Sequence, residues 1–238
     1  MKVSWHNRIV LPALLITTIL MGFSSPAFCE DASAGAVVEL NKIDRDALAI
    51  LGKGVVGKAL PAWPIKDTAR LMPFRKGKWT YQITAGDREG KRQVMSISKT
   101  DREGEPNLWD RSVVGDCTEF FSVKGGGAVN LVSEIYLKQD VIVHYTPMLP
   151  IMFDGMKPGD KAQVETEIKI YDLHDPTFLK YSGRLKVIYT YLGVYEITVP
   201  AGKYEAVLIK SSYKGKVGPA HVVDGGYTFY ARDVGMVA

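Results

Sequence analysis

Residues 163–170 read QVETEIKI, and apolar and polar side chains alternate along the whole stretch. Val164, Ile168 and Ile170 fall on one side, whereas the glutamates and Lys169 fall on the other. Successive side chains of a β-strand point to opposite faces of its sheet, so this period of two predicts a strand with one buried and one solvated face. Antiparallel sheets commonly have one face in water, and the stretch therefore favours an antiparallel neighbourhood.

The same period of two recurs on both sides of this stretch, for example in residues 77–84 and 185–191. Segments rich in turn-forming residues separate the alternating stretches: 85–90, 125–127, 172–177 and 200–202. About ten strands result, all consistent with antiparallel pairing. Strands with one apolar face must cover that face, and the chain offers a single strong helix to do so. The predicted fold is mainly β: a single curved antiparallel sheet, a half-barrel or open barrel, with one N-terminal amphipathic helix.

That helix is predicted over residues 36–51, where apolar residues recur at spacings of three and four and the pattern ends near Gly52. Its apolar stripe consists of Val37, Leu40, Ile43, Ala47, Ile50 and Leu51. Residues 61–73 contain three prolines and predict an extended linker laid along the fold. The segment 146–160 is too apolar for a surface loop, so we expect it to cover the mouth of the sheet or to pack into its concave side.

The first 29 residues have the pattern of an export signal. Lys2 and Arg8 precede an uncharged apolar run over residues 9–23, and no acidic residue occurs before Glu30. The run is about 15 residues long, short of the roughly 20 that a helix needs to cross a bilayer. The predicted organisation is a signal peptide (1–29), an N-terminal helix with a Pro-containing linker (30–73) and an antiparallel β domain (74–238).

Export predicts a mature protein in the periplasm, with no integral membrane span. Cys29 is an alternative lipidated first residue, but the residues before it lack the Leu and the small residue of bacterial lipoprotein signals, which disfavours a lipid anchor. The full chain has 30 basic and 26 acidic residues, and the predicted signal removes two of the basic ones. This near balance gives no electrostatic basis for binding nucleic acid.

No motif in the sequence has a complete catalytic pattern. Residues 48–59 resemble a phosphate-binding loop, but Ala59 stands where that loop needs a hydroxyl for Mg²⁺, which favours a helix terminus instead. Glu165 and Glu167 share one strand face, where a solvated surface explains them better than a glycosidase pair does. Cys117 is interpreted as a small buried hydrophobe rather than a nucleophile.

Histidines are the remaining candidates for metal or hydrolytic chemistry. His144, His174 and His221 have no short-range ligand spacing, so the sequence predicts no metal and no cofactor. A hydrolase site assembled across strands stays open, because such sites are recognised by geometry rather than by sequence order.

Aromatic residues are frequent in the predicted strands and would line the concave side of a curved sheet, where an apolar cavity can form. Plain core packing is the alternative for each of them. The candidate ligand-binding residues are Trp109, Phe121, Tyr136, Tyr145, Phe153, Tyr189 and Tyr191.

Three segments, 71–81, 195–206 and 227–237, resemble a family of exported bacterial β-rich proteins of unknown function. Members have an early aromatic strand, a Val-Pro-Ala-Gly turn followed by an aromatic residue, and a terminal Gly-Val-Gly-like segment. The matching structural turn residues here are Pro200, Gly202 and Gly235. Related chains continue into another strand, whereas this sequence ends at Ala238, which leaves an open sheet edge or an incomplete chain.

The resemblance implies a half-barrel with the shape of envelope lipoprotein carriers. The leading hypothesis is therefore a non-catalytic periplasmic binding protein for an apolar or amphiphilic ligand such as a lipid, covered by the N-terminal helix and by residues 146–160. The alternative is an envelope interaction or assembly protein that binds another envelope protein through a sheet edge or an aromatic patch. A third class, a hydrolase, predicts a cleft in which one of the histidines meets a carboxylate, a serine or Cys117.

Overall fold

The computed structural model describes residues 17–18, 35–85, 88–102, 105–123 and 128–238. Apart from Thr17–Thr18, the predicted signal peptide lies outside the described residues, as does the Gly-rich turn at 125–127.

Within these residues, 13 strands form one antiparallel sheet with the path β1-β3-β4-β5-β6-β7-β8-β9-β10-β11-β12-β13, and β2 pairs with β10. Along the described path the sheet stays open, because β1 and β13 each pair with one neighbour. The fold-class prediction is confirmed. The strands are β1 (Thr17–Thr18), β2 (Val56–Leu60), β3 (Gly77–Gln82), β4 (Arg92–Arg102), β5 (Glu105–Val113), β6 (Cys117–Val123), β7 (Val129–Tyr136), β8 (Val141–Pro150), β9 (Lys161–Asp172), β10 (Leu179–Val199), β11 (Gly202–Val217), β12 (Ala220–Ala231) and β13 (Gly235–Met236).

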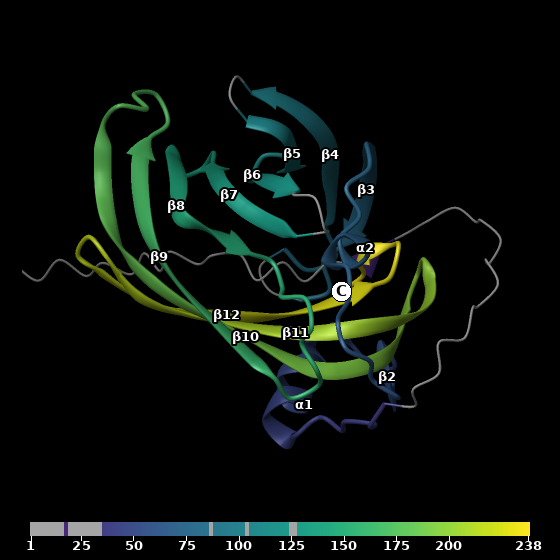
Figure 1. The fold of residues 1–238 in the computed structure, drawn as a ribbon. Coiled ribbons are helices and arrows are strands. Elements are labelled where there is room, and N and C mark those ends of the chain that lie inside the picture. The colour runs from purple at the N-terminus through teal and green to yellow at the C-terminus, as the bar shows by residue number, and fades with distance from the viewer. Residues whose placement is uncertain (1–16, 19–34, 86–87, 103–104, 124–127) are drawn as a thin grey trace, which may run out of the picture.

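The sheet curls around an interior. Figure 1 shows the long strands β10, β11 and β12 running beneath the shorter strands β3 to β8, with α1 on the outer side of the long strands. We call β5–β8 the short wall and β10–β12 the long wall. Every strand from β3 to β13 pairs with its neighbour in sequence. Because the sheet curls between them, the two walls face each other across the interior (Figure 1).

The N-terminal helix is shorter than predicted and buries a different face. It comprises α1 (Lys42–Leu48) and a 3-10 turn (Ala49–Leu51), and it begins after Asn41, whose side chain accepts a hydrogen bond from the Asp44 backbone N–H at 2.9 Å. Of the predicted apolar stripe, Val37, Ile43 and Ile50 are exposed, and the Ile43 side chain is 75% exposed. Leu51 of the predicted stripe is buried, and Asp44 and Leu48, which were not in the stripe, complete the buried face.

The predicted linker 61–73 also differs, because it contains the short helix α2 (Thr68–Leu71). Ile65 of this linker is fully buried. Its backbone N–H donates to Met156 O at 2.8 Å and its carbonyl oxygen accepts from the Gly155 N–H at 2.7 Å, which joins the linker to segment 146–160. Residues 146–150 continue β8 rather than forming a loop, and the rest of the segment buries Met152 and Met156 in the interior cluster, as the concave-side prediction required.

The long wall is buried on both faces, whereas the sequence pattern predicted one. Val207 and Ile209 on β11 belong to the interior cluster, and Ala206 and Leu208 belong to an outer cluster that α1 covers through Leu48 and Leu51. The alternation of β10 changes face at a register shift between Tyr191 and Gly193, so Tyr191 packs inside while Tyr195 packs outside. Gly202 begins β11 and Gly235 begins β13, and their φ angles of 139° and 101° favour glycine.

Candidate functional site

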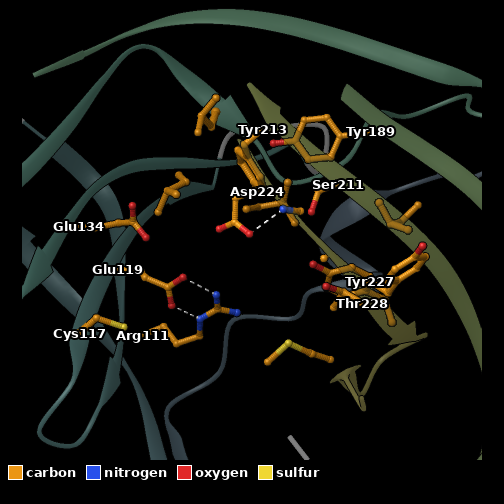
Figure 2. Close-up of a pocket in the computed structure, with 18 of the residues that line it drawn as sticks. Arg111, Cys117, Glu119, Glu134, Tyr189, Ser211, Tyr213, Asp224, Tyr227 and Thr228 are labelled. Atoms are coloured by element: carbon orange, nitrogen blue, oxygen red, sulfur yellow. Dashed lines mark hydrogen bonds and ion pairs between the residues drawn. The ribbon is translucent and has the colours of Figure 1, made fainter. Parts of the chain in front are cut away.

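A cavity of about 380 Å³ lies between the short wall and the long wall. Both walls contribute tyrosines: Tyr136 and Tyr145 come from β7 and β8, and Tyr189, Tyr213 and Tyr230 come from β10, β11 and β12. Leucines, isoleucines and valines fill much of the remaining lining. The lining also includes Leu48, Leu51 and Tyr227, which belong to the outer cluster, so it continues beyond the concave side onto the face that α1 covers. Figure 2 shows Glu134, Glu119 and Arg111 on one side of this space and Tyr189, Ser211 and Tyr227 on the other.

Strand register places three charged residues in one row across the short wall. Arg111 on β5 lies directly opposite Glu119 on β6, and Glu119 lies directly opposite Glu134 on β7. Directly opposite side chains on one face of an antiparallel sheet are close neighbours, so the first pair attracts and the second repels. All three side chains line the cavity.

Arg111 and Glu119 form a two-bond ion pair. The Arg111 Nε and one Nη lie 2.5 and 2.7 Å from the two carboxylate oxygens of Glu119. This fork geometry is the strong form of the guanidinium–carboxylate interaction. The two side chains are 14% and 17% exposed, so water reaches the pair only in part. The Arg111–Glu119 pair therefore adds no net charge to the short wall.

Glu134 is a buried carboxyl group whose hydrogen-bond partners are tyrosines. Its residue is 5% exposed, and its two oxygens accept from the Tyr136 hydroxyl at 3.0 Å and from the Tyr145 hydroxyl. Burial, followed by repulsion from Glu119, raises the pKa of Glu134 from 4.5 to about 7, although the two tyrosines and Arg111 act in the opposite direction. Near neutral pH this group therefore changes between a charged acceptor and a neutral donor.

Asp224 adds a further carboxylate from the long wall. It is half-buried, lies near the middle of the space in Figure 2, and accepts a hydrogen bond from the Gly225 N–H at 2.7 Å. The cavity thus combines apolar walls with convergent carboxyl and hydroxyl groups, which suits an amphiphilic molecule better than a purely apolar one.

Three of the seven predicted ligand-binding residues, Tyr136, Tyr145 and Tyr189, line this cavity. The other four do not line it; they pack in the surrounding core. Phe121 is fully buried and its ring centroid lies 5.2 Å from that of Phe74, which in turn lies 5.8 Å from Trp109.

The remaining two predicted residues, Phe153 and Tyr191, also lie outside the lining. Phe153 meets the cavity residue Tyr189 edge-to-face at 5.7 Å between ring centroids, and the fully buried Tyr191 donates its hydroxyl to Trp63 O at 2.9 Å. These contacts match the core-packing alternative.

Sequence reasoning missed the polar groups of the cavity, namely Arg111, Glu119, Glu134, Tyr213 and Asp224. A charged residue at an inward-facing strand position would have been the signal, but Arg111 follows Asp110 and Glu119 lies between Thr118 and Phe120, so neither stands out from its local sequence. Only the strand register brings Arg111, Glu119 and Glu134 into one row.

Cys117 and the histidines occupy positions without catalytic geometry. The Cys117 thiol is buried, and burial followed by the nearby Glu119 and Glu134 raises its pKa to about 12, so it is held as a thiol. His144, His174 and His221 are exposed, lie in different elements and do not line the cavity. His174 lies 3.5 Å from Asp140 in an exposed turn.

Among the described residues, no group of three or more His, Cys, Asp or Glu residues could hold a metal ion. Of the described helices, none has the length and apolar character needed to cross a membrane.

No protein-family model and no curated protein matches the chain. Among solved structures it is similar to a Bacteroides fragilis protein described as a candidate exported protein with a YmcC-like fold, at 14% identity and a TM-score of 0.37, covering 69% of this chain and 87% of that one. A candidate lipoprotein from Parabacteroides distasonis is similar at 16% identity and a TM-score of 0.31, covering 70% of this chain and 87% of that one. TM-scores this low do not establish a shared fold, so the family resemblance stays a prediction.

Proposed function

We propose that this chain is a non-catalytic periplasmic binding protein that holds an amphiphilic ligand between the short wall and the long wall. The observation that supports it is the cavity of about 380 Å³, whose size and mixed lining lie in the range of small-molecule sites. The export pattern of residues 1–29 supports the compartment. Leu149 near the end of β8 and Ile151 just after it contribute lining, as a cover of the ligand would, whereas the N-terminal helix packs on the outer face of the long wall and does not cover the concave side.

A cavity-blocking variant with a matched control tests this function. Ser211 lines the cavity on β11, whereas Ser212 is the next residue of the same strand and its side chain points to the other face. Ser211→Trp places an indole in the cavity, and Ser212→Trp places the same indole outside it. Both variants are compared with the wild type by circular dichroism and by the fluorescence of phenylnaphthylamine, an apolar probe.

We expect the wild type and Ser212→Trp to enhance probe fluorescence and Ser211→Trp to lose that enhancement while staying folded. Mass spectrometry of gently purified wild-type protein should reveal a copurifying apolar or amphiphilic molecule. Equal probe binding by the two tryptophan variants, together with no copurifying molecule, would refute the proposal.

The second candidate function, an envelope interaction or assembly protein, has its own supporting observation. Phe178, Leu179 and Tyr181 at the start of β10 are exposed by 57%, 45% and 48%, and they form an apolar patch at one hairpin end. In the described part of the chain, β12 pairs with β13 at Tyr230 and Ala231, and Phe229 exchanges backbone hydrogen bonds with Val237 and Ala238, so residues 220–228 of β12 present a sheet edge. Crosslinking in intact cells from Phe178 or Val223 should give one recurrent protein adduct for a scaffold, whereas a carrier need not give one.

A further inference from the structure

We infer that the cavity selects a ligand whose polar end is a cationic ammonium group and discriminates against the corresponding anion. This inference rests on the proposed binding function and names the class of ligand. Three features of the lining support it: the balance of charge, the position of Glu134 and the choice of aromatic residue.

The side chains of the cavity have an excess of negative charge. Among the described residues that line it, Arg111 is the one cation, whereas Glu119, Glu134 and Asp224 are carboxylates. Glu119 already holds two nitrogens of Arg111, which makes that pair neutral. Lys210 on β11 does not change this balance, because its ammonium group lies 2.6 Å from Asp44 under α1. A ligand in the cavity therefore meets two carboxylates that have no cationic partner of their own.

Glu134 is the carboxylate for which a ligand cation matters most. A carboxylate removed from water needs a counter-charge or becomes protonated, and tyrosine hydroxyls supply hydrogen bonds without supplying charge. The titratable groups that face Glu134 are Arg111 on β5, Glu119 and Cys117 on β6, Tyr136 on β7, Tyr145 on β8, Tyr213 on β11 and Asp224 on β12. The one cation in this set belongs to Glu119, so an ammonium group brought by the ligand would be its missing partner.

The aromatic lining consists of tyrosine throughout. Five tyrosines line it on the concave side, namely Tyr136, Tyr145, Tyr189, Tyr213 and Tyr230, and Tyr227 lines it from the outer face, where its hydroxyl donates to Asp44. The faces of tyrosine rings attract ammonium and quaternary ammonium groups, and this attraction is strongest where water is excluded. An anionic head group would gain nothing from these ring faces and would be repelled by Glu134 and Asp224.

A matched set of dodecyl amphiphiles tests the inference with the full-length mature protein. Dodecyltrimethylammonium, dodecanol and dodecanoate share one alkyl chain and differ in the charge at its end. Their affinities are measured below micelle formation by displacement of phenylnaphthylamine. At about pH 8.5, where Glu134 is ionised, we expect the cationic probe to bind about ten-fold or more tighter than dodecanoate, with dodecanol between them.

Two comparisons assign the preference to Glu134. Glu134→Gln keeps an acceptor for the tyrosine hydroxyls and should weaken the cationic probe about five-fold while leaving dodecanol unchanged. Glu165→Gln is the control, because Glu165 is exposed on the outer face of β9. In the wild type, lowering the pH from about 8.5 to about 5.5 should weaken the permanently charged cationic probe by a similar factor, since Glu134 takes up a proton in that range.

The pH comparison needs no variant and decides the question if Glu134→Gln does not fold. Binding of all three amphiphiles with equal affinity, or tighter binding of dodecanoate, would overturn the cationic preference and leave the binding function standing. If no amphiphile displaces the probe from the cavity, the proposed function itself fails and the preference fails with it.

Discussion

Asp44→Ala should loosen the N-terminal helix from the outer face of the long wall. The Asp44 side chain is 3% exposed, and one of its oxygens lies 2.6 Å from both Lys210 Nζ and the Tyr227 hydroxyl. Its other oxygen accepts from Asn41 Nδ2 at 2.6 Å. Burial by itself would raise the pKa of Asp44, but the hydrogen bonds from Lys210, Tyr227 and Asn41 outweigh it and lower the pKa below 3.8.

The expected loss follows from these contacts. Hydrogen bonds to a charged group contribute about 1.5–3 kcal/mol each, and breaking a buried ion pair costs about 3–5 kcal/mol. The Lys210 side chain is 32% exposed and can recover water when its partner is removed, so the estimate falls to about 2–3 kcal/mol. Asp46→Ala, two residues further along the same helix and exposed, should change the free energy of unfolding by less than about 0.5 kcal/mol.

Urea unfolding and limited proteolysis across residues 41–52 measure the two variants. Proteolysis is included because the helix can detach locally before the sheet unfolds. Asp44 has a lowered pKa in the folded state, so its contribution is present at neutral pH and is lost as the pH falls through that pKa. The difference between wild type and Asp44→Asn should therefore shrink below about pH 4. If Asp44→Ala and Asp46→Ala have equal stability and equal protease resistance at neutral pH, the reasoning is wrong.

Three further predictions concern the interior. Cys117 should resist alkylation by iodoacetamide in the folded protein and react once urea unfolds it; rapid reaction of the native protein would contradict its burial. Gly183→Ala should lower the free energy of unfolding by about 3 kcal/mol, because a Cβ there would lie 2.0 Å from Lys216 O, and Ser182→Ala is the neutral control in the same urea experiment. Because the folded-state pKa of Glu134 is raised from 4.5 to about 7, wild-type stability relative to Glu134→Gln should fall as the pH rises from about 4.5 to about 7, and the opposite slope in urea midpoints would refute the assignment.

The period-two pattern was sufficient to predict the sheet and its antiparallel order, because alternation reports which face of a strand is dry. It was insufficient for the long wall. Ala206, Val207, Leu208 and Ile209 are all buried, and a run of four apolar residues does not reveal that a helix covers the second face.

The helix prediction failed in an informative way. Apolar residues at spacings of three and four between Val37 and Leu51 indicated a buried stripe, but Val37, Ile43 and Ile50 within it are exposed. Hydrogen bonds from Lys210 and Tyr227 turn Asp44 towards the sheet instead, and Leu48 follows it on the same face. Both partners of Asp44 lie more than 160 residues away in the sequence, so no local pattern could contain this information.

The charged row of the short wall is the feature that packing explains least. Arg111, Glu119 and Glu134 stand side by side on a face that elsewhere buries apolar residues, and the Glu119–Glu134 contact is repulsive. Apolar residues of similar volume in place of a buried ion pair are often neutral or stabilising, so the row is not needed to hold the sheet together. A cavity that must orient one end of an amphiphile does need a fixed polar group at one place on an otherwise apolar wall. The proposed binding function thus accounts for Glu134 beside Glu119, a repulsive placement that the packing of the sheet does not require.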